Sequence, residues 1–314
     1  MSIRYQIAEG SSMASCRCFD RAPGTARRAG LRWIRRGLVG LALLLASAPL
    51  SGQVFYTVET GDGRLSWLLG TLHTEDPRVL DLPPVLVQAL ADAERIALEL
   101  VPDAEMLGAL NVAMMLPRDE RLSALLDERL YADILELLDP YGLGPSAVER
   151  MRPWAVAMTL ALPPPETGLF MDMALAFRGV RHGADMVALE TLDEQLAFLT
   201  GLGRDAHIEM LALAVDDLKR GRTLFETLIR AYLARDADRL RELTERELAR
   251  MGPAIRERFE REGLTERNAR MAERAAPLID QGRTLVAVGA LHLPGEDGLV
   301  ARLRAMGYRV EPIY

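Results

Sequence analysis

The chain has 314 residues, enough to bury a sizeable core, and 49% of them are hydrophobic, which excludes an intrinsically disordered composition. Its formal net charge is −7 at pH 7. Residues 1–52 hold eight arginines against two acidic residues, so the remainder carries a net charge of −13. A surface this acidic is a poor partner for nucleic acid, and we expect no nucleic-acid binding.

The first 52 residues have the pattern of an export signal. A run of arginines precedes the apolar stretch 37–46, and small residues follow it, which is the order of a secretory signal. A membrane-spanning helix needs ~20 apolar residues, about twice this stretch. We therefore expect export to the periplasm and removal of residues 1–52, without stable membrane insertion afterwards; an uncleaved membrane anchor is the alternative. Cys16 and Cys18 would leave with this segment, so the mature protein would have neither disulfides nor thiolate ligands.

The expected mature chain begins with two β-rich runs around a Gly/Asp turn, residues 54–58 and 65–69. This pattern predicts a hairpin. The second run ends at the tetrapeptide Gly70-Thr71-Leu72-His73. After an expected helix that begins at a Pro-Pro pair, residues 95–100 predict a short buried strand that ends near Ala97-Leu98-Glu99.

A long helical region follows, in which Leu122, Leu125, Leu126, Leu130 and Ile134 form one apolar stripe at helical spacing. The order of strands and helices predicts an α/β fold, with a mixed, partly parallel sheet flanked by helices and a large helical insertion, in one domain over residues 53–314. The further helices are expected at 148–162, 167–180, 192–219 with a break at 201–203, 223–250 as two helices, 264–279 and 298–306; the further strands are expected at 184–190, 284–288 and 309–313.

Two short motifs each occur twice in this pattern. The sequence Gly-x-Leu-His ends the apolar runs before His73 and His292, and Ala-Leu-Glu ends the runs before Glu99 and Glu190. Ligands of α/β sheets bind beyond the carboxyl ends of the strands. If the four strands are neighbours, two imidazoles and two carboxylates converge at one site.

Two nitrogens and one or two oxygens, without sulfur, suit a divalent zinc, manganese, cobalt or iron ion. A carboxylate that does not bind the metal could act as a general base. Each residue also has a plainer interpretation: Glu99 and Glu190 could cap the following helices or pair with arginine, and single Gly-x-x-His motifs arise by chance. The motif glycines, Gly70 and Gly289, could permit a sharp turn or the close approach of a strand or substrate.

These blocks, taken in order, resemble the TraB/GumN family, whose exported bacterial members are similar to the animal TIKI metalloproteases. The resemblance implies a fold like that of the erythromycin esterase and ChaN-like proteins, and a metal site on both histidine motifs. It implies His73, His292 and Glu190 as metal ligands, and Arg267 and Asn268 as residues that orient substrate or ligands. The blocks that carry the resemblance are residues 68–73, 189–196, 266–272, 288–299 and 307–310.

The resemblance implies a metal-dependent hydrolase that cleaves a peptide or protein, with manganese, cobalt or zinc as the divalent metal. In this interpretation His73, His292 and Glu190 hold the metal, and Glu99 completes the ligand set or acts as the base. The alternative is a non-catalytic periplasmic protein that binds a peptide or haem iron. The GumN name suggests a role in exopolysaccharide production, for which the residues carry no sign of sugar chemistry. The sequence specifies no oligomeric state.

Overall fold

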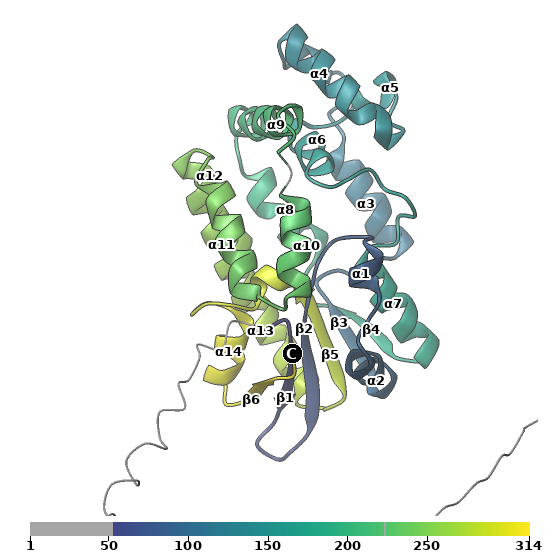
Figure 1. Ribbon diagram of the computed structural model, residues 1–314, viewed down its shortest axis with the longest axis vertical. Helices are drawn as coiled ribbons and strands as arrows, with labels where there is room; N and C mark the ends of the chain where they lie inside the picture. Colours follow the sequence, from purple (N-terminus) through teal and green to yellow (C-terminus); the bar gives the residue numbers. More distant parts are fainter. Residues whose placement is uncertain (1–52, 223) are drawn as a thin grey trace, which may run out of the picture. The chain divides into compact units, whose positions relative to one another are not determined.

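Figure 1 shows a computed structural model of the chain, which describes residues 53–222 and 224–314. The predicted export segment, residues 1–52, lies outside the described residues. Within the part described, the strands form one six-stranded sheet in the order β4-β3-β5-β2-β1-β6. The strands are β1 Phe55–Glu59, β2 Leu65–Thr71, β3 Arg95–Leu98, β4 Asp185–Ala188, β5 Thr284–Gly289 and β6 Arg309–Pro312.

The sheet is mixed, as predicted. The four neighbouring strands β4, β3, β5 and β2 are parallel to one another. Strand β1 pairs antiparallel with both β2 and β6, and the β1–β2 pair is the predicted hairpin. The expectation of a mixed, partly parallel sheet is therefore confirmed.

The central strands are apolar along their length because both faces of the sheet are covered. Every residue of β5 from Thr284 to Val288 is buried, which is typical of parallel strands. Leu285 and Ala287 enter the hydrophobic cluster on one face, and Val286 and Val288 enter the cluster on the other. One strand thus supplies both cores, because successive side chains point to opposite faces.

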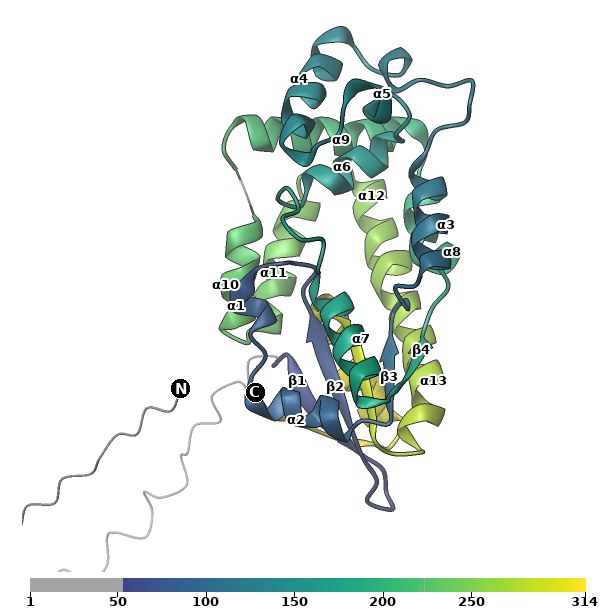
Figure 2. The same ribbon diagram turned by 90° about the vertical axis from the view of Figure 1, so that its right-hand side faces the viewer.

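Helices form the two covering layers (Figure 2). Helices α2 (Pro84–Asp92) and α7 (Met171–His182) supply buried residues to one cluster, and α13 (Glu266–Ile279) and α14 (Leu299–Ala305) supply residues to the other. Helix α7 lies very close to β3, since a Cβ atom on Gly179 would lie 2.1 Å from Cδ1 of Ile96. A side chain at this position would push the helix off the sheet.

The described helices other than α2, α7, α13 and α14 are α1 Pro77–Leu80, α3 Ala104–Met114, α4 Glu128–Leu138, α5 Pro145–Val148, α6 Pro153–Leu160, α8 Leu192–Thr200, α9 Arg204–Lys219, α10 Phe225–Leu233, α11 Ala237–Leu248, α12 Pro253–Arg258, the π-helix Phe259–Thr265, and the 3-10 helices Leu122–Ala124, Asp139–Tyr141 and Ala290–His292. Helices α4, α5, α6, α8, α9 and α12 have a hydrophobic cluster of their own, which is the core of the predicted insertion, whereas α1, α10 and α11 contribute buried residues to the same cluster as α2 and α7. Leu122 and Ile134 of the predicted stripe are fully buried in the cluster of the insertion. Within the described part of the chain, no helix is both long and apolar enough to cross a bilayer.

The helix boundaries differ from the expectations where local capping decides them. The stripe that begins at Leu122 is divided, because the Asp127 side chain accepts a hydrogen bond from the backbone N–H of Leu130 and starts α4 there. Helix α3 was not predicted from the sequence. It buries none of its residues, and so its sequence lacks the periodic apolar stripe by which a packed helix is recognised.

Candidate functional site

The four parallel strands end at the same edge of the sheet, and each is followed by one of the repeated motif residues. In the order of the strands these are Glu190 after β4, Glu99 after β3, His292 after β5 and His73 after β2. The backbone continues the β3–β4 pairing past the strands, since Glu190 N donates to Glu99 O at 2.9 Å. The four strands are therefore neighbours, which is the condition on which the predicted site depended.

The two glutamates share one arginine. Arg267 of α13 donates from Nη2 to Glu99 Oε2 at 2.8 Å and to Glu190 Oε2 at 2.6 Å, and from Nε to Glu190 Oε2 at 2.9 Å. The Glu190 side chain is fully buried, and the Arg267 side chain is 10% exposed. Arginine pairing, one of the plainer interpretations of both glutamates, is therefore observed. Capping is not: Asp103 caps α3, and Thr191 caps α8.

This arrangement favours the charged forms of the arginine and of Glu99. Burial lowers the pKa of Arg267, but the two carboxylates outweigh burial and raise that pKa above its ordinary value. Burial likewise raises the pKa of Glu99, but the positive charge of Arg267 and the hydrogen bond from the N–H of Gly289 lower it below its usual range. Glu99 is therefore ionised at neutral pH.

Glu99 is held by two further donors. Its Oε1 accepts the N–H of Gly289 at 2.6 Å, and its Oε2 accepts the side-chain amide of Gln195 at 2.8 Å. A Cβ atom on Gly289 would lie 3.2 Å from Glu99 Oε1. The group that closely approaches this glycine is thus a carboxylate of the site. The sequence predicts no role for Gln195. The feature that could have identified it as a residue of the site is its position in the first turns of the helix that follows Glu190.

The other motif glycine permits contact between the two motifs. A Cβ atom on Gly70 would lie 2.7 Å from Cδ1 of Leu293 and 2.9 Å from the Cα of Ala290. Gly70 does not adopt a left-handed backbone conformation, since the φ of Gly70 is not positive. Glycine is required here because the loop of the second tetrapeptide packs against β2.

His292 is buried, and its proton is assigned by its neighbours. Asn268 donates from Nδ2 to the carbonyl of Asp297 at 3.0 Å, so its Oδ1 faces His292 Nδ1 at 2.6 Å. Nδ1 must therefore carry the hydrogen and donate it, which leaves a lone pair on Nε2. Burial, reinforced by Arg267 and opposed by Glu99, lowers the pKa of His292 to about 4, and the ring is neutral at pH 7.

A lone pair and an ionised carboxylate consequently lie close together. His292 Nε2 is 3.6 Å from Glu99 Oε1. Two acceptors at this spacing repel each other unless a cation or a donor lies between them. Two ligand atoms about 2.1 Å from a tetrahedral metal would be about 3.4 Å apart. The pair therefore fits two ligands of one divalent ion in chemistry and in spacing.

His73 lies in a different environment. Its side chain is 61% exposed and stacks on Phe170, with ring centroids 4.0 Å apart and planes at 9°. Its Nδ1 is 3.8 Å from Asp172 Oδ2, and Thr71 donates to the other oxygen of that carboxylate at 2.9 Å. The structure thus brings Glu99, Glu190, His292, Arg267 and Asn268 together, and it places His73 at the same edge in a separate cluster.

The third ligand of a metal site is not assembled. Among residues 53–222 and 224–314, no three His, Cys, Asp or Glu side chains lie close enough to hold an ion. Glu190 Oε1 is buried and has no hydrogen-bond partner in the described part of the chain; Arg270 Nη2, at 3.7 Å, forms an ion pair with it but is too far away for a hydrogen bond. The residues therefore fit a metal in part, because two donors, His292 and Glu99, are in place. The candidates for a third donor, His73 and Glu190, are held by other contacts.

Comparison with known proteins places these motifs in a family. The model of the TraB/PrgY/gumN family matches residues 54–312, which confirms the resemblance seen in the sequence. No curated protein and no solved structure matches the chain.

Proposed function

Because the chain belongs to the TraB/PrgY/gumN family, we propose that it is an exported metal-dependent hydrolase whose substrate is a peptide or protein. One observation carries the proposal. The unprotonated Nε2 of the buried His292 lies 3.6 Å from the ionised Glu99 at the carboxyl edge of four parallel strands. This edge is where α/β sheets bind their ligands.

In this proposal His292 and Glu99 hold a divalent manganese, cobalt or zinc ion. His73 is the further ligand that we favour, because it follows a strand of the same edge and its exposed ring could turn toward the ion on leaving its stacking contact with Phe170. A bound ion would polarise the scissile carbonyl and lower the pKa of a bound water. Glu99 thus takes the ligand role predicted for Glu190, because it is the carboxylate nearer to His292.

The other residues of the site act on protons and positions. Glu190 Oε1 is a carboxylate oxygen of the site that has no hydrogen-bond partner among the described residues, so we assign it as the base that accepts the proton of an attacking water. Arg267 pairs with both carboxylates and fixes them relative to each other. Asn268 keeps the proton of His292 on Nδ1, which leaves Nε2 available, and outer partners of this kind orient metal-binding histidines.

Metal content tests the proposal. The full chain, exported and purified from the periplasm, should bind about one equivalent of manganese, cobalt or zinc in equilibrium dialysis with elemental analysis. His292→Ala and Glu99→Gln should each weaken binding by tenfold or more, whereas His182→Ala, an exposed histidine at the end of α7, should leave it unchanged. Wild-type protein that binds none of the three ions would refute the metal-dependent reaction. Recovery of the chain in the cytoplasmic fraction would refute export.

A non-catalytic peptide- or haem-iron-binding protein is the second candidate. The observation that favours it is the Arg267 bridge, which gives both carboxylates a cationic partner without a metal. A binding protein would retain peptide at a one-to-one ratio and release it intact in the presence of metal. Mass spectrometry of the recovered peptide separates the two candidates.

A further inference from the structure

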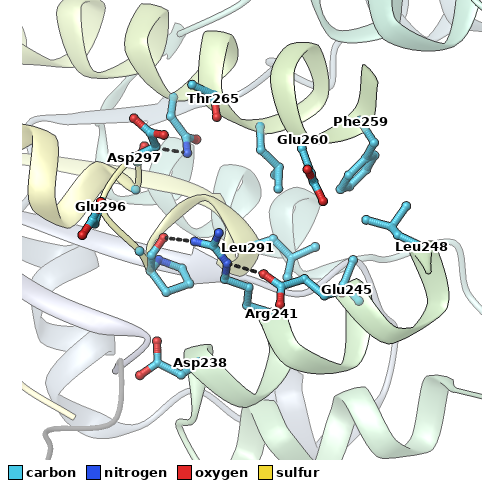
Figure 3. A pocket seen from close by; sticks show the side chains of 16 residues that line it. Asp238, Arg241, Glu245, Leu248, Phe259, Glu260, Thr265, Leu291, Glu296 and Asp297 are labelled. Atoms are coloured by element: carbon cyan, nitrogen blue, oxygen red, sulfur yellow. Dashed lines mark hydrogen bonds and ion pairs between the residues drawn. The ribbon is translucent and has the colours of Figure 1, made fainter. Parts of the chain in front are cut away.

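A cavity of about 560 Å³ lies beside the candidate site (Figure 3). Helix α11, the π-helix, the start of α13 and the loop that follows His292 form its walls. Asn268, which is 3% exposed and binds the His292 proton, is part of the wall, and so is Leu291, the residue before His292. The cavity therefore adjoins the candidate site through Asn268 and Leu291, although His292 itself does not line it.

The cavity is strongly acidic. Arg241 is its one basic residue in the described part of the chain, and its charge is used, because Nε lies 2.7 Å from Glu245 Oε1. Among the residues that the structure describes, the carboxylates of Glu260 and Glu296 make no ion pair or hydrogen bond. The acidic residues of the lining are Asp238, Glu245, Glu260, Glu296 and Asp297, of which Asp297 is paired with Arg302 at 2.9 Å.

The lining is also partly apolar. In Figure 3, Phe259 and Glu260 project from one wall, and Arg241 and Glu245 lie on the wall opposite. Further apolar lining comes from Leu248, Leu264, Leu291 and Pro294. A wall of this kind accommodates an aliphatic stem, while the carboxylates at the rim attract a cationic head.

The spread of the carboxylates argues against a bare metal ion. No three of the described acidic side chains converge as metal ligands, whereas a long cationic side chain can meet separate carboxylates along its length. A π-helix, rare in proteins and frequent at functional sites, places Phe259 and Glu260 on this wall.

From the cavity, its charge and its position beside Asn268 and Leu291 of the candidate site, we infer that it binds a lysine or arginine side chain of the substrate. This inference rests on the proposed peptide substrate, and it makes the protein selective for basic sequences. Glu260 is the principal recognition residue, with Glu296 at the rim.

Binding of matched peptides tests the inference without requiring turnover. Three peptides of Gly, Ser and Ala differ only at one central position, which is lysine, norleucine or glutamate. Isothermal titration of the full exported chain should show the lysine peptide binding about tenfold more tightly than the norleucine peptide, and the glutamate peptide more weakly still. Added sodium chloride should reduce the preference, because partly exposed charges are screened.

Two sets of variants test whether the preference for the lysine peptide comes from this cavity or from the general negative charge of the protein. Glu260→Gln with Glu296→Gln should reduce the preference for lysine about fivefold. Glu105→Gln with Glu136→Gln removes two exposed carboxylates, one from α3 and one from α4, and should leave the preference unchanged. Equal affinities for the lysine and norleucine peptides, no measurable binding of the lysine peptide, or equal losses in the cavity and control variants would each overturn the inference.

Hydrolysis of the same peptides distinguishes the two proposals. Selective binding of the lysine peptide without cleavage would refute the proposed hydrolysis and support the proposed lysine-binding cavity. Cleavage with no preference for lysine at any position near the scissile bond would refute the lysine-binding cavity and support the proposed hydrolysis.

Discussion

Replacement of Arg267 by methionine tests the central contact of the site. Methionine keeps much of the apolar stem but removes the guanidinium that binds Glu99 and Glu190. The loss of one partner from a buried ion pair costs about 3–5 kcal/mol, because the remaining charge stays buried without compensation. The Glu190 side chain is fully buried and the Glu99 side chain is 16% exposed, so water can replace little of the lost interaction.

Protonation sets an upper limit to this loss. A carboxyl that must take up a proton at pH 7 costs about 1.4 kcal/mol for each pH unit above the ordinary glutamic acid pKa near 4.3, which is about 4 kcal/mol in total. We therefore expect Arg267→Met to lower the free energy of unfolding by about 3–4 kcal/mol at pH 7. The difference from wild type should shrink by about 1.4 kcal/mol for each unit that the pH is lowered toward 5.

Urea unfolding followed by circular dichroism measures both quantities. Arg270→Met is the matched control, because Arg270 lies one turn further along α13 and only approaches Glu190, at 3.7 Å. Its loss should stay below about 1 kcal/mol. The reasoning fails if Arg267→Met costs no more than this control, or if its cost does not depend on pH.

Three further changes test other contacts. Gly70→Ala would place a methyl 2.9 Å from the Cα of Ala290 and should destabilise the protein by about 1–3 kcal/mol in urea unfolding; an unchanged midpoint would show that the loop can move away. Asn268→Ala should weaken metal binding by about 10–100-fold in dialysis and alter the nitrogen chemical shifts of His292, and unchanged shifts would contradict the assigned proton position. Glu194, paired with an arginine of α13 that lowers its pKa to about 2, should contribute about 1 kcal/mol at pH 7 as a helix cap. Because its folded pKa is depressed to about 2, the difference between wild type and Glu194→Gln in urea unfolding should shrink as the pH falls below about 4.5 and be lost below pH 2, and a difference that does not shrink over this range would disprove the assignment.

Much of the fold could be predicted because the relevant signals are local. The apolar runs before Gly70 and Gly289 identify buried strands, and the alternation of strands and helices identifies an α/β sheet with a parallel centre. Helix α3 could not be predicted in this way, since its residues are not sorted into a buried and an exposed face.

The sequence by itself placed His73, Glu99, Glu190 and His292 at the ends of parallel strands, because strand ends and their motifs are local properties of the chain. Only the tertiary structure decided how these side chains are used. The bridge from Arg267 to Glu99 joins residues 168 positions apart, and the contact of Asn268 with His292 depends on how α13 packs against the sheet. Such contacts depend on the relative positions and rotamers of distant elements, to which no local pattern corresponds. For this reason the repeated motifs predicted one shared site, whereas the folded chain pairs His292 with Glu99 and holds His73 apart, against Phe170.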